Sequence, residues 1–77
     1  MAETETLLDA SGLNCPMPLL KAKQALNALP GGALLRVVAT DPGSVRDFEV
    51  FARQSGHVLV CATQDHGRFE YVLRKKV

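Results

Sequence analysis

The sequence predicts an α/β (α+β) fold, a two-layer sandwich with elements in the order β-α-β-α-β-β. Strand-like apolar runs alternate with helix-like apolar stripes along the chain, and Pro and Gly separate these segments. The last two segments are strands joined by a short turn, which predicts a hairpin. In so small a sheet, right-handed crossovers favour four strands in a mixed arrangement with both helices on one face.

The first half of the chain predicts a strand, a helix and a second strand. Residues 6–10 form the first strand, and residues 11–14 form a loop. A helix is predicted over residues 16–29, and residues 30–32, which read Pro-Gly-Gly, end it. Its apolar residues recur at helical spacing: Leu19, Ala22, Ala25, Leu26 and Leu29. Residues 33–40 are almost continuously apolar, which predicts a central strand.

The second half predicts a helix followed by the hairpin. Asp41 is predicted to cap this helix and Pro42 to lie in its first turn, while Ser55-Gly56 marks its end. Four apolar residues are predicted to share one face of it: Val45, Phe48, Phe51 and Ala52. Residues 57–64 and 69–74 form the hairpin strands, with a turn at residues 65–68.

Composition excludes several classes of protein. The 77 residues suffice for one core, so a single domain over residues 1–77 is expected. A net charge of +1 is unlike that of a nucleic-acid binder, and direct nucleic-acid binding is not expected. Two cysteines without zinc-ligand spacing predict neither a disulfide scaffold nor a metal site.

Targeting signals are also missing from the sequence. Residues 1–6 are polar and acidic, unlike a signal peptide, and no apolar run approaches the length of a membrane helix. We therefore expect a cytoplasmic protein that makes no membrane contact. We also expect the chain to be a monomer when free.

Cys15 is the candidate catalytic residue, because its place at a helix start favours a nucleophilic thiolate. Pro16 follows it, and Pro is favoured at the first helical position, so Cys15 is predicted to be the N-cap. Unpaired N–H groups and the helix dipole stabilise negative charge there, and cysteines so placed have pKa values of about 3.5 to 7.5. Gly12, Pro16 and Pro18 are predicted to position the helix start and direct the sulfur.

The rest of the sequence excludes two common uses of a reactive thiol. A hydrolytic thiol needs a base, and neither His57, at a strand start, nor His66, in a turn, is expected to reach Cys15. A thioredoxin-like pair would need a cysteine where Pro18 stands. Cys61 is predicted to pack within its strand. What remains is a lone thiolate that accepts a group and hands it on.

Met17 and Leu20 form a candidate docking patch. Both fall outside the core stripe of the first helix, beside Lys21 and Gln24. Two large apolar side chains close to a reactive sulfur favour contact with a partner protein. Scattered exposed apolar residues are also ordinary on protein surfaces.

Residues 8–18, which read LDASGLNCPMP, resemble the opening signature of the TusA/SirA family of small sulfur carriers. The Cys-Pro-x-Pro motif at residues 15–18 is its discriminating part. The likeness covers nearly the whole chain, in the same order. Its further segments are residues 30–31, 40–47, 56–59 and 71–75.

The resemblance implies the same two-layer sandwich and a sulfane sulfur carried as a persulfide on Cys15. It implies a donor protein, either a PLP-dependent cysteine desulfurase or a rhodanese-type protein. It also implies an acceptor, either a DsrE-type relay protein or a sulfur-oxidation complex. The sulfur would serve tRNA thiolation, cofactor sulfur supply or sulfur oxidation. The carrier would hold no PLP or metal, and whether it counts as an enzyme stays open, because it turns over only with its partners.

The resemblance further implies a partner-facing surface at four positions: Leu20, Lys23, Asp41 and Arg46. Leu20 agrees with the candidate docking patch. Phe48-Glu49 stands where many members have Ile-Pro, and Cys61 is not a motif position. These departures concern the identity of the partners and leave Cys15 unchanged.

Two other functions are compatible with the sequence. A non-catalytic regulatory or RNA-binding module would bind RNA in a salt-sensitive way without Cys15. One Tyr, three Phe and no Trp offer it few stacking surfaces. A redox sensor would carry a sulfenic acid or a mixed disulfide on Cys15 in place of a persulfide.

Overall fold

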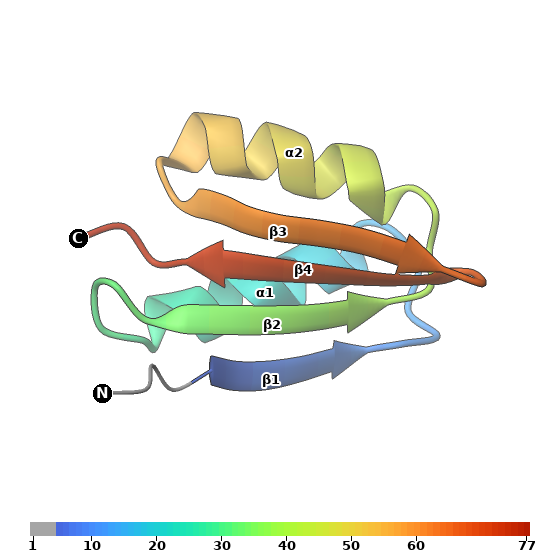
Figure 1. The fold of residues 1–77 in the computed structure, drawn as a ribbon, viewed down its shortest axis with the longest axis horizontal. Coiled ribbons are helices and arrows are strands. Elements are labelled where there is room, and N and C mark those ends of the chain that lie inside the picture. Colours follow the sequence, from blue (N-terminus) through green and yellow to red (C-terminus); the bar gives the residue numbers. More distant parts are fainter. Residues whose placement is uncertain (1–4) are drawn as a thin grey trace.

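The chain forms a two-layer sandwich of one sheet and two helices (Figure 1). The computed structural model describes residues 5–77, so most of the polar N-terminal segment considered above, residues 1–4, lies outside the described residues. Six elements follow in the predicted order. They are β1 (Glu5–Ala10), α1 (Met17–Asn27), β2 (Leu34–Ala39), α2 (Ser44–Ser55), β3 (Val58–Asp65) and β4 (Arg68–Arg74).

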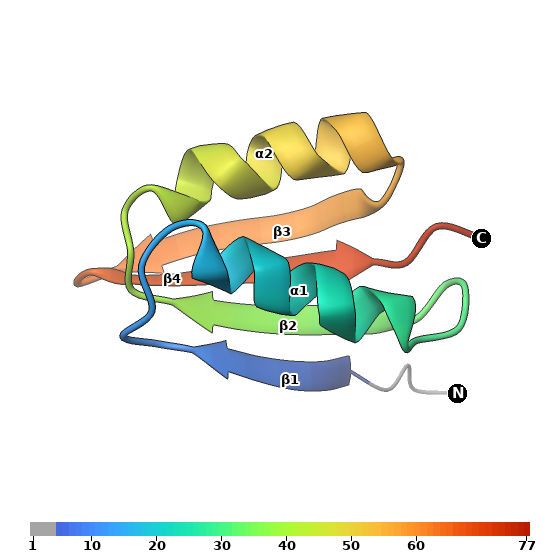
Figure 2. The ribbon, with the colours of Figure 1, turned by 180° about the vertical axis from the view of Figure 1, so that it is seen from behind.

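The four strands lie in the order β1-β2-β4-β3. β1 and β2 are parallel, while β4 is antiparallel to both β2 and β3, so the sheet is mixed as predicted. The apolar strand β2 is central, which is also confirmed. A two-residue turn joins β3 to β4, and both His66 and Gly67 have positive φ, as a tight type I′ hairpin requires. Both helices cover the same face of the sheet (Figure 2).

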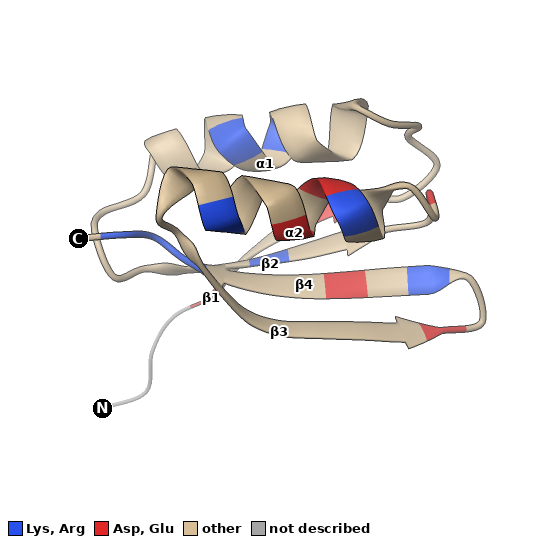
Figure 3. Ribbon diagram, turned by 90° about the horizontal axis from the view of Figure 1, so that it is seen from above, with Lys and Arg blue, Asp and Glu red and all other residues tan. Residues whose placement is uncertain are grey.

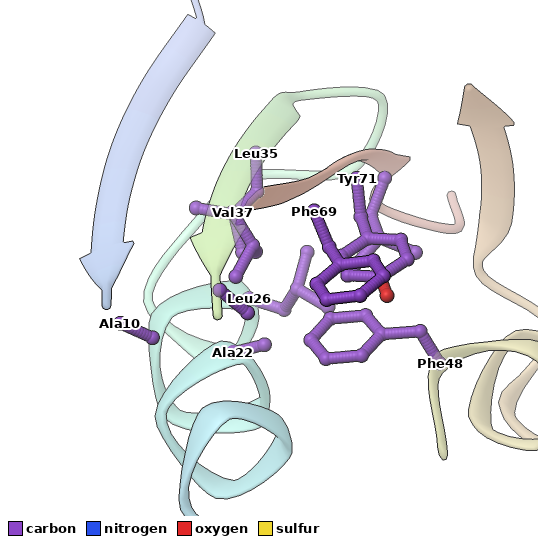
Figure 4. Close-up of a cluster of buried hydrophobic side chains, with 10 residues drawn as sticks. Ala10, Ala22, Leu26, Leu35, Val37, Phe48, Phe69 and Tyr71 are labelled. Carbon is purple, nitrogen blue, oxygen red and sulfur yellow. The ribbon is translucent and has the colours of Figure 1, made fainter. Parts of the chain in front are cut away.

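The core lies between the two layers, where alternate strand residues meet one stripe of each helix (Figure 4). Leu35 and Val37 of β2 and Tyr71 of β4 point toward the helices and are at most 1% exposed. Leu26 of α1 and Phe48 of α2 face them and are fully buried. The Phe48 ring stacks on Tyr71 with centroids 4.4 Å apart. This pair ties α2 to the sheet.

The helix stripes were predicted more accurately for α1 than for α2. All five predicted α1 residues contact the core: Leu19, Ala22, Ala25, Leu26 and Leu29. On α2, Phe48 and Phe51 contact the core as predicted, but Val45 is exposed. Ser44, one turn before Phe48, is buried instead, because its hydroxyl bonds the Tyr71 hydroxyl at 2.7 Å.

Both helices begin later than predicted. α1 starts at Met17, and α2 starts at Ser44 with Gly43 as its N-cap and no side-chain capping bond. The prediction that Asp41 caps α2 and Pro42 lies in its first turn is therefore wrong. The chain first makes a turn, in which the Ser44 N–H donates to the Asp41 carbonyl at 3.0 Å. The carboxylate of Asp41 is left to bond other backbone groups.

The carboxyl ends of β1 and β2 lie side by side because these strands are parallel. The loops that follow them therefore meet at one end of the sheet (Figure 1). In the first loop Gly12 has φ +80°, a conformation that glycine adopts at little cost, and its N–H donates to Thr40 Oγ1 at 2.8 Å. This bond fastens the loop that carries Cys15 to the end of β2.

The sheet face opposite the helices carries no second layer in the described part of the chain. Near its centre Arg36 bridges Glu5 and Glu70, each at 2.9 Å. Cys61 pairs with Val72 in the register of β3 and β4 and is exposed. The prediction that Cys61 packs within its strand is wrong, because β3 is an edge strand and few side chains cover it.

The buried hydroxyl pair offers a test of this packing. Tyr71→Phe should lower the free energy of unfolding by about 1–3 kcal/mol, because Ser44, 2% exposed, keeps a hydroxyl without a partner. The double variant Tyr71→Phe, Ser44→Ala should lose less than the sum of the single changes. Urea unfolding measures all three, and strictly additive losses would contradict the coupling.

Candidate functional site

Cys15 is exposed in the loop between β1 and α1, two residues before the helix. Its backbone N–H donates to Asp41 Oδ2 at 2.8 Å, and its thiol donates to Asp47 Oδ2 at 2.7 Å. The peptide bond between Cys15 and Pro16 is cis. The segment after β2 and the start of α2 therefore hold the Cys15 backbone and its sulfur in place.

Cys15 is not the N-cap of α1, which corrects the sequence prediction. The N-cap is Pro16, and the helix has no side-chain capping bond. Among the first N–H groups, that of Met17 donates to the Asn14 carbonyl at 2.8 Å. Pro18 lies in the first turn as expected and is buried. The thiol is thus directed toward Asp47 of α2.

The electrostatics of the site are the reverse of those predicted. The hydrogen bond from the thiol to Asp47 raises the pKa of Cys15 above its ordinary value. Partial desolvation and the negative charges of Asp47 and Asp41 raise this pKa further. A helix start offers only about half a positive charge, whereas each carboxylate carries a full negative charge close to the sulfur. The carboxylates therefore outweigh the helix.

Asp47 was missed as a site residue by reasoning from the sequence. It lies 32 positions beyond Cys15, in the first turn of α2. A usable signal was present, because loops that follow two neighbouring parallel strands meet at one edge of the sheet. Pairing of residues 6–10 with residues 33–40 would have placed the polar segment 40–47 beside Cys15.

A groove of about 180 Å³ runs between α1 and α2, next to Asp47. Its lining residues are Leu19, Lys23, Arg46, Asp47, Val50, Phe51 and Gln54. It brings together Lys23 and Arg46, two of the predicted partner-facing residues, from different helices. The Lys23 ammonium lies over the Phe51 ring, 5.6 Å from its centroid. α2 itself carries both basic and acidic residues (Figure 3).

The remaining predicted partner-facing residues lie on α1 or in the segment after β2. Met17 and Leu20 lie on α1 and are 40% and 42% exposed, so they fall outside the core as predicted. Asp41 is partly buried and accepts the Cys15 N–H. Each of these residues therefore reaches the surface near the thiol or binds the loop that carries it.

Neither histidine approaches the thiol as a base. His57 lies at the start of β3, where its Nδ1 accepts the N–H of Lys76 at 3.0 Å, and burial lowers its pKa. His66 is in the hairpin turn, where its Nδ1 lies 2.6 Å from Asp65 Oδ1. Within residues 5–77, no cluster of three His, Cys, Asp or Glu side chains is placed to hold a metal ion. Over the same residues, no helix has the length and hydropathy needed to cross a membrane.

Fold and site together define a small two-layer α/β protein that presents a cysteine at the carboxyl end of a parallel strand pair. The family model described as Sulfurtransferase TusA matches residues 6–75, and the chain belongs to this family. The resemblance noted at residues 8–18 is confirmed.

Individual relatives agree with the family. The sulfur carrier protein TusA of Allochromatium vinosum is 51% identical over 75 residues, covering 97% of this chain and 99% of the relative. That of Pseudomonas putida is 44% identical over 72 residues, covering 94% and 90%. A crystal structure of a SirA-like protein from Desulfitobacterium hafniense superposes with a TM-score of 0.80 at 25% identity, covering 96% of this chain and all of the other. These names support a sulfur carrier role, which implies contact with donor and acceptor proteins.

The raised pKa of Cys15 has a consequence for its reactivity. In a Cys61→Ser variant, which leaves Cys15 as the reactive thiol, the alkylation rate should rise with pH to a midpoint above about 8.5, the value for free cysteine. Asp47 and Asp41 disfavour the thiolate, so it forms only at higher pH. Iodoacetamide kinetics across pH measure this midpoint. A midpoint below neutrality would show that the helix start controls the thiol.

Proposed function

We propose that this protein is a sulfur carrier in which Cys15 accepts sulfane sulfur as a persulfide and passes it to an acceptor protein. One observation carries the proposal: an exposed Cys15, bonded at its N–H and at its sulfur, in a chain of the TusA family. An exposed thiol is open to another protein's persulfide, and a fixed loop presents it in a constant direction.

The transfer is a displacement at sulfur. The Cys15 sulfur attacks the outer sulfur of the donor persulfide, and a new S–S bond forms while the donor's S–S bond breaks. The donor thiol leaves with the electron pair and takes up the proton that Cys15 loses. The acceptor thiol then attacks the outer sulfur on Cys15 in the same way. Neither step consumes an oxidant or a reductant.

The surroundings of Cys15 suit a carrier better than an enzyme that transforms its cargo. In the described part of the chain, the titratable side chain bonded to the thiol is Asp47, and a carboxylate is a weaker base than the imidazole that activates hydrolytic thiols. Cys61, the second thiol, lies on the sheet face opposite the helices and is no resolving partner. Turnover then depends on a donor and an acceptor.

We assign Gly12, Pro16 and Pro18 to positioning of Cys15. Gly12 supports this role through its positive φ and its bond to Thr40, and Pro18 through its burial against the core. Pro16 supports it as the N-cap residue that directly follows the nucleophile. Substitutions at these positions act on the direction of the sulfur and leave its chemistry unchanged.

We assign partner contact to Met17, Leu20, Lys23, Asp41 and Arg46. Met17 and Leu20 are assigned because they are exposed on α1. Lys23 and Arg46 line the groove between the helices, and Asp41 accepts the Cys15 N–H. The donor in this proposal is a cysteine desulfurase or a rhodanese-type protein. The acceptor is a DsrE-type relay protein or a sulfur-oxidation complex. The relay operates in the cytoplasm, with the chain as one domain that holds no cofactor of its own.

Sulfur loading tests the carrier function directly. After incubation with sodium polysulfide, wild type and Cys61→Ser should each gain about 32 Da, the mass of one sulfur atom, at Cys15. Cys15→Ser should gain nothing at that position. Intact and peptide mass spectrometry, followed by release with dithiothreitol, reads the result. Equal labelling of Cys15→Ser and wild type would refute the proposal.

The docking patch has a separate test. The double variant Met17→Ser, Leu20→Ser should load normally from polysulfide, because the sulfur is held by its hydrogen bond to Asp47. Its loading rate from a cysteine desulfurase should fall by about tenfold or more, the scale for loss of central apolar interface residues. Leu7→Ser, which removes an apolar side chain 65% exposed on the opposite sheet face, serves as the matched control. Equal rates for both variants would exclude the patch from docking.

A further inference from the structure

Two carboxylates lie at the Cys15 residue, and among residues 5–77 no ion pair with a basic side chain neutralises them. Asp41 accepts the Cys15 N–H and Asp47 accepts the thiol proton. Within residues 5–77 neither carboxylate forms a salt bridge with a basic side chain. Lys23 and Arg46 line the groove beyond Asp47, but the Lys23 ammonium lies over the Phe51 ring. The site thus presents an uncompensated pair of negative charges at the position of the nucleophile.

This arrangement lowers the reactivity of Cys15 in the free protein. Sulfur attacks as a thiolate, and a thiolate beside Asp47 would place two negative charges in contact. Asp47 is also unable to act as an efficient base. Proton transfer from a thiol to a carboxylate is unfavourable, because a carboxylic acid is a much stronger acid than a thiol. Asp47 therefore keeps the proton on the sulfur, and some further group must change the balance of charge.

On the basis of the proposed carrier function, we propose that the donor protein supplies a lysine or arginine side chain that pairs with Asp47 and Asp41 and thereby frees Cys15 for attack. The partner that fits this surface combines a basic side chain with apolar residues that cover Met17 and Leu20. Docking and activation are then one event, because the cation reaches the carboxylates only when the surfaces meet.

The activated step is balanced without any further reagent. The partner cation pairs with the Asp47 carboxylate, which loosens the hydrogen bond from the thiol. The thiol proton ends on the leaving thiolate of the donor, while the Cys15 S–S bond forms and the donor S–S bond breaks. In an undocked carrier the carboxylates disfavour the thiolate, which slows alkylation and oxidation of the exposed thiol.

The first test removes the carboxylate charge, in a Cys61→Ser background. Asp47→Asn should lower the midpoint of the alkylation pH profile and raise the rate at pH 7 by about three- to tenfold, since one pKa unit changes the thiolate fraction tenfold. Asp41→Asn should change both in the same direction and by less. Glu49→Gln makes an equal charge change on α2 at a carboxylate that is not among the groups raising the pKa of Cys15, and it should leave both unchanged. Equal profiles for Asp47→Asn, Asp41→Asn and Glu49→Gln would overturn the proposal.

The second test supplies a cation without a partner. Hexalysine, added at low salt, should raise the alkylation rate of Cys15 in the Cys61→Ser protein by a similar factor. High salt should remove the effect, and hexaglutamate should not produce it. In the double variant Asp41→Asn, Asp47→Asn, hexalysine should have no effect. An unchanged rate in the Cys61→Ser protein, or an equal rise in the double variant, would contradict activation through these carboxylates.

Both measurements follow alkylation and involve no sulfur transfer. Polysulfide loading of the same proteins, read by mass, reports separately whether the carrier function itself fails. Circular dichroism shows whether each variant is folded. Asp41→Asn and Asp47→Asn change different residues, so either variant that folds tests the proposal.

Discussion

The parallel pairing of β1 with β2 is the constraint on which the rest of the site depends. Parallel strands place their carboxyl ends side by side, so the loop that carries Cys15 lies against the segment that leads into α2. Three hydrogen bonds then join the two segments, from Gly12 to Thr40 and from Cys15 to Asp41 and Asp47. Without this pairing, residues about 30 positions apart would have no reason to meet, and Cys15 would be an ordinary loop thiol.

The same contacts allow the Cys15 thiol to be exposed and still react slowly with other electrophiles. A carrier must offer its sulfur to other proteins, and an exposed thiolate would react with any electrophile that reached it. Asp47 and Asp41 resolve this conflict, because they raise the pKa of Cys15 while leaving it at the surface. Apolar Met17 and Leu20 and the groove between the helices lie nearby, so the features available to a partner surround the group that this partner would activate.

Much of the fold could be predicted from local patterns, for reasons that are visible in particular residues. The α1 stripe, the apolar run of β2 and the Gly67 turn each depend on neighbours within a few positions. The predictions were wrong where a residue bonds a partner that is distant in the sequence. Asp41 has the chemistry of a cap but bonds the Cys15 N–H, and Ser44 replaces Val45 in the buried stripe because Tyr71 offers it a hydroxyl partner. Cys61 was misjudged because a strand's apolar content does not show that it lies at an edge.

The sequence by itself determined the order of the elements, the family and the cysteine that defines the site. These follow from the Cys-Pro-x-Pro motif at residues 15–18 and from hydrophobic periodicity, both of which are local. Tertiary structure alone decided the state of that cysteine. A helix start was expected to lower the pKa of Cys15, and Asp47, 32 positions away, raises it instead. The reason is that electrostatic interaction depends on distance in space, and a full charge in contact with the sulfur outweighs the partial charge of a helix end.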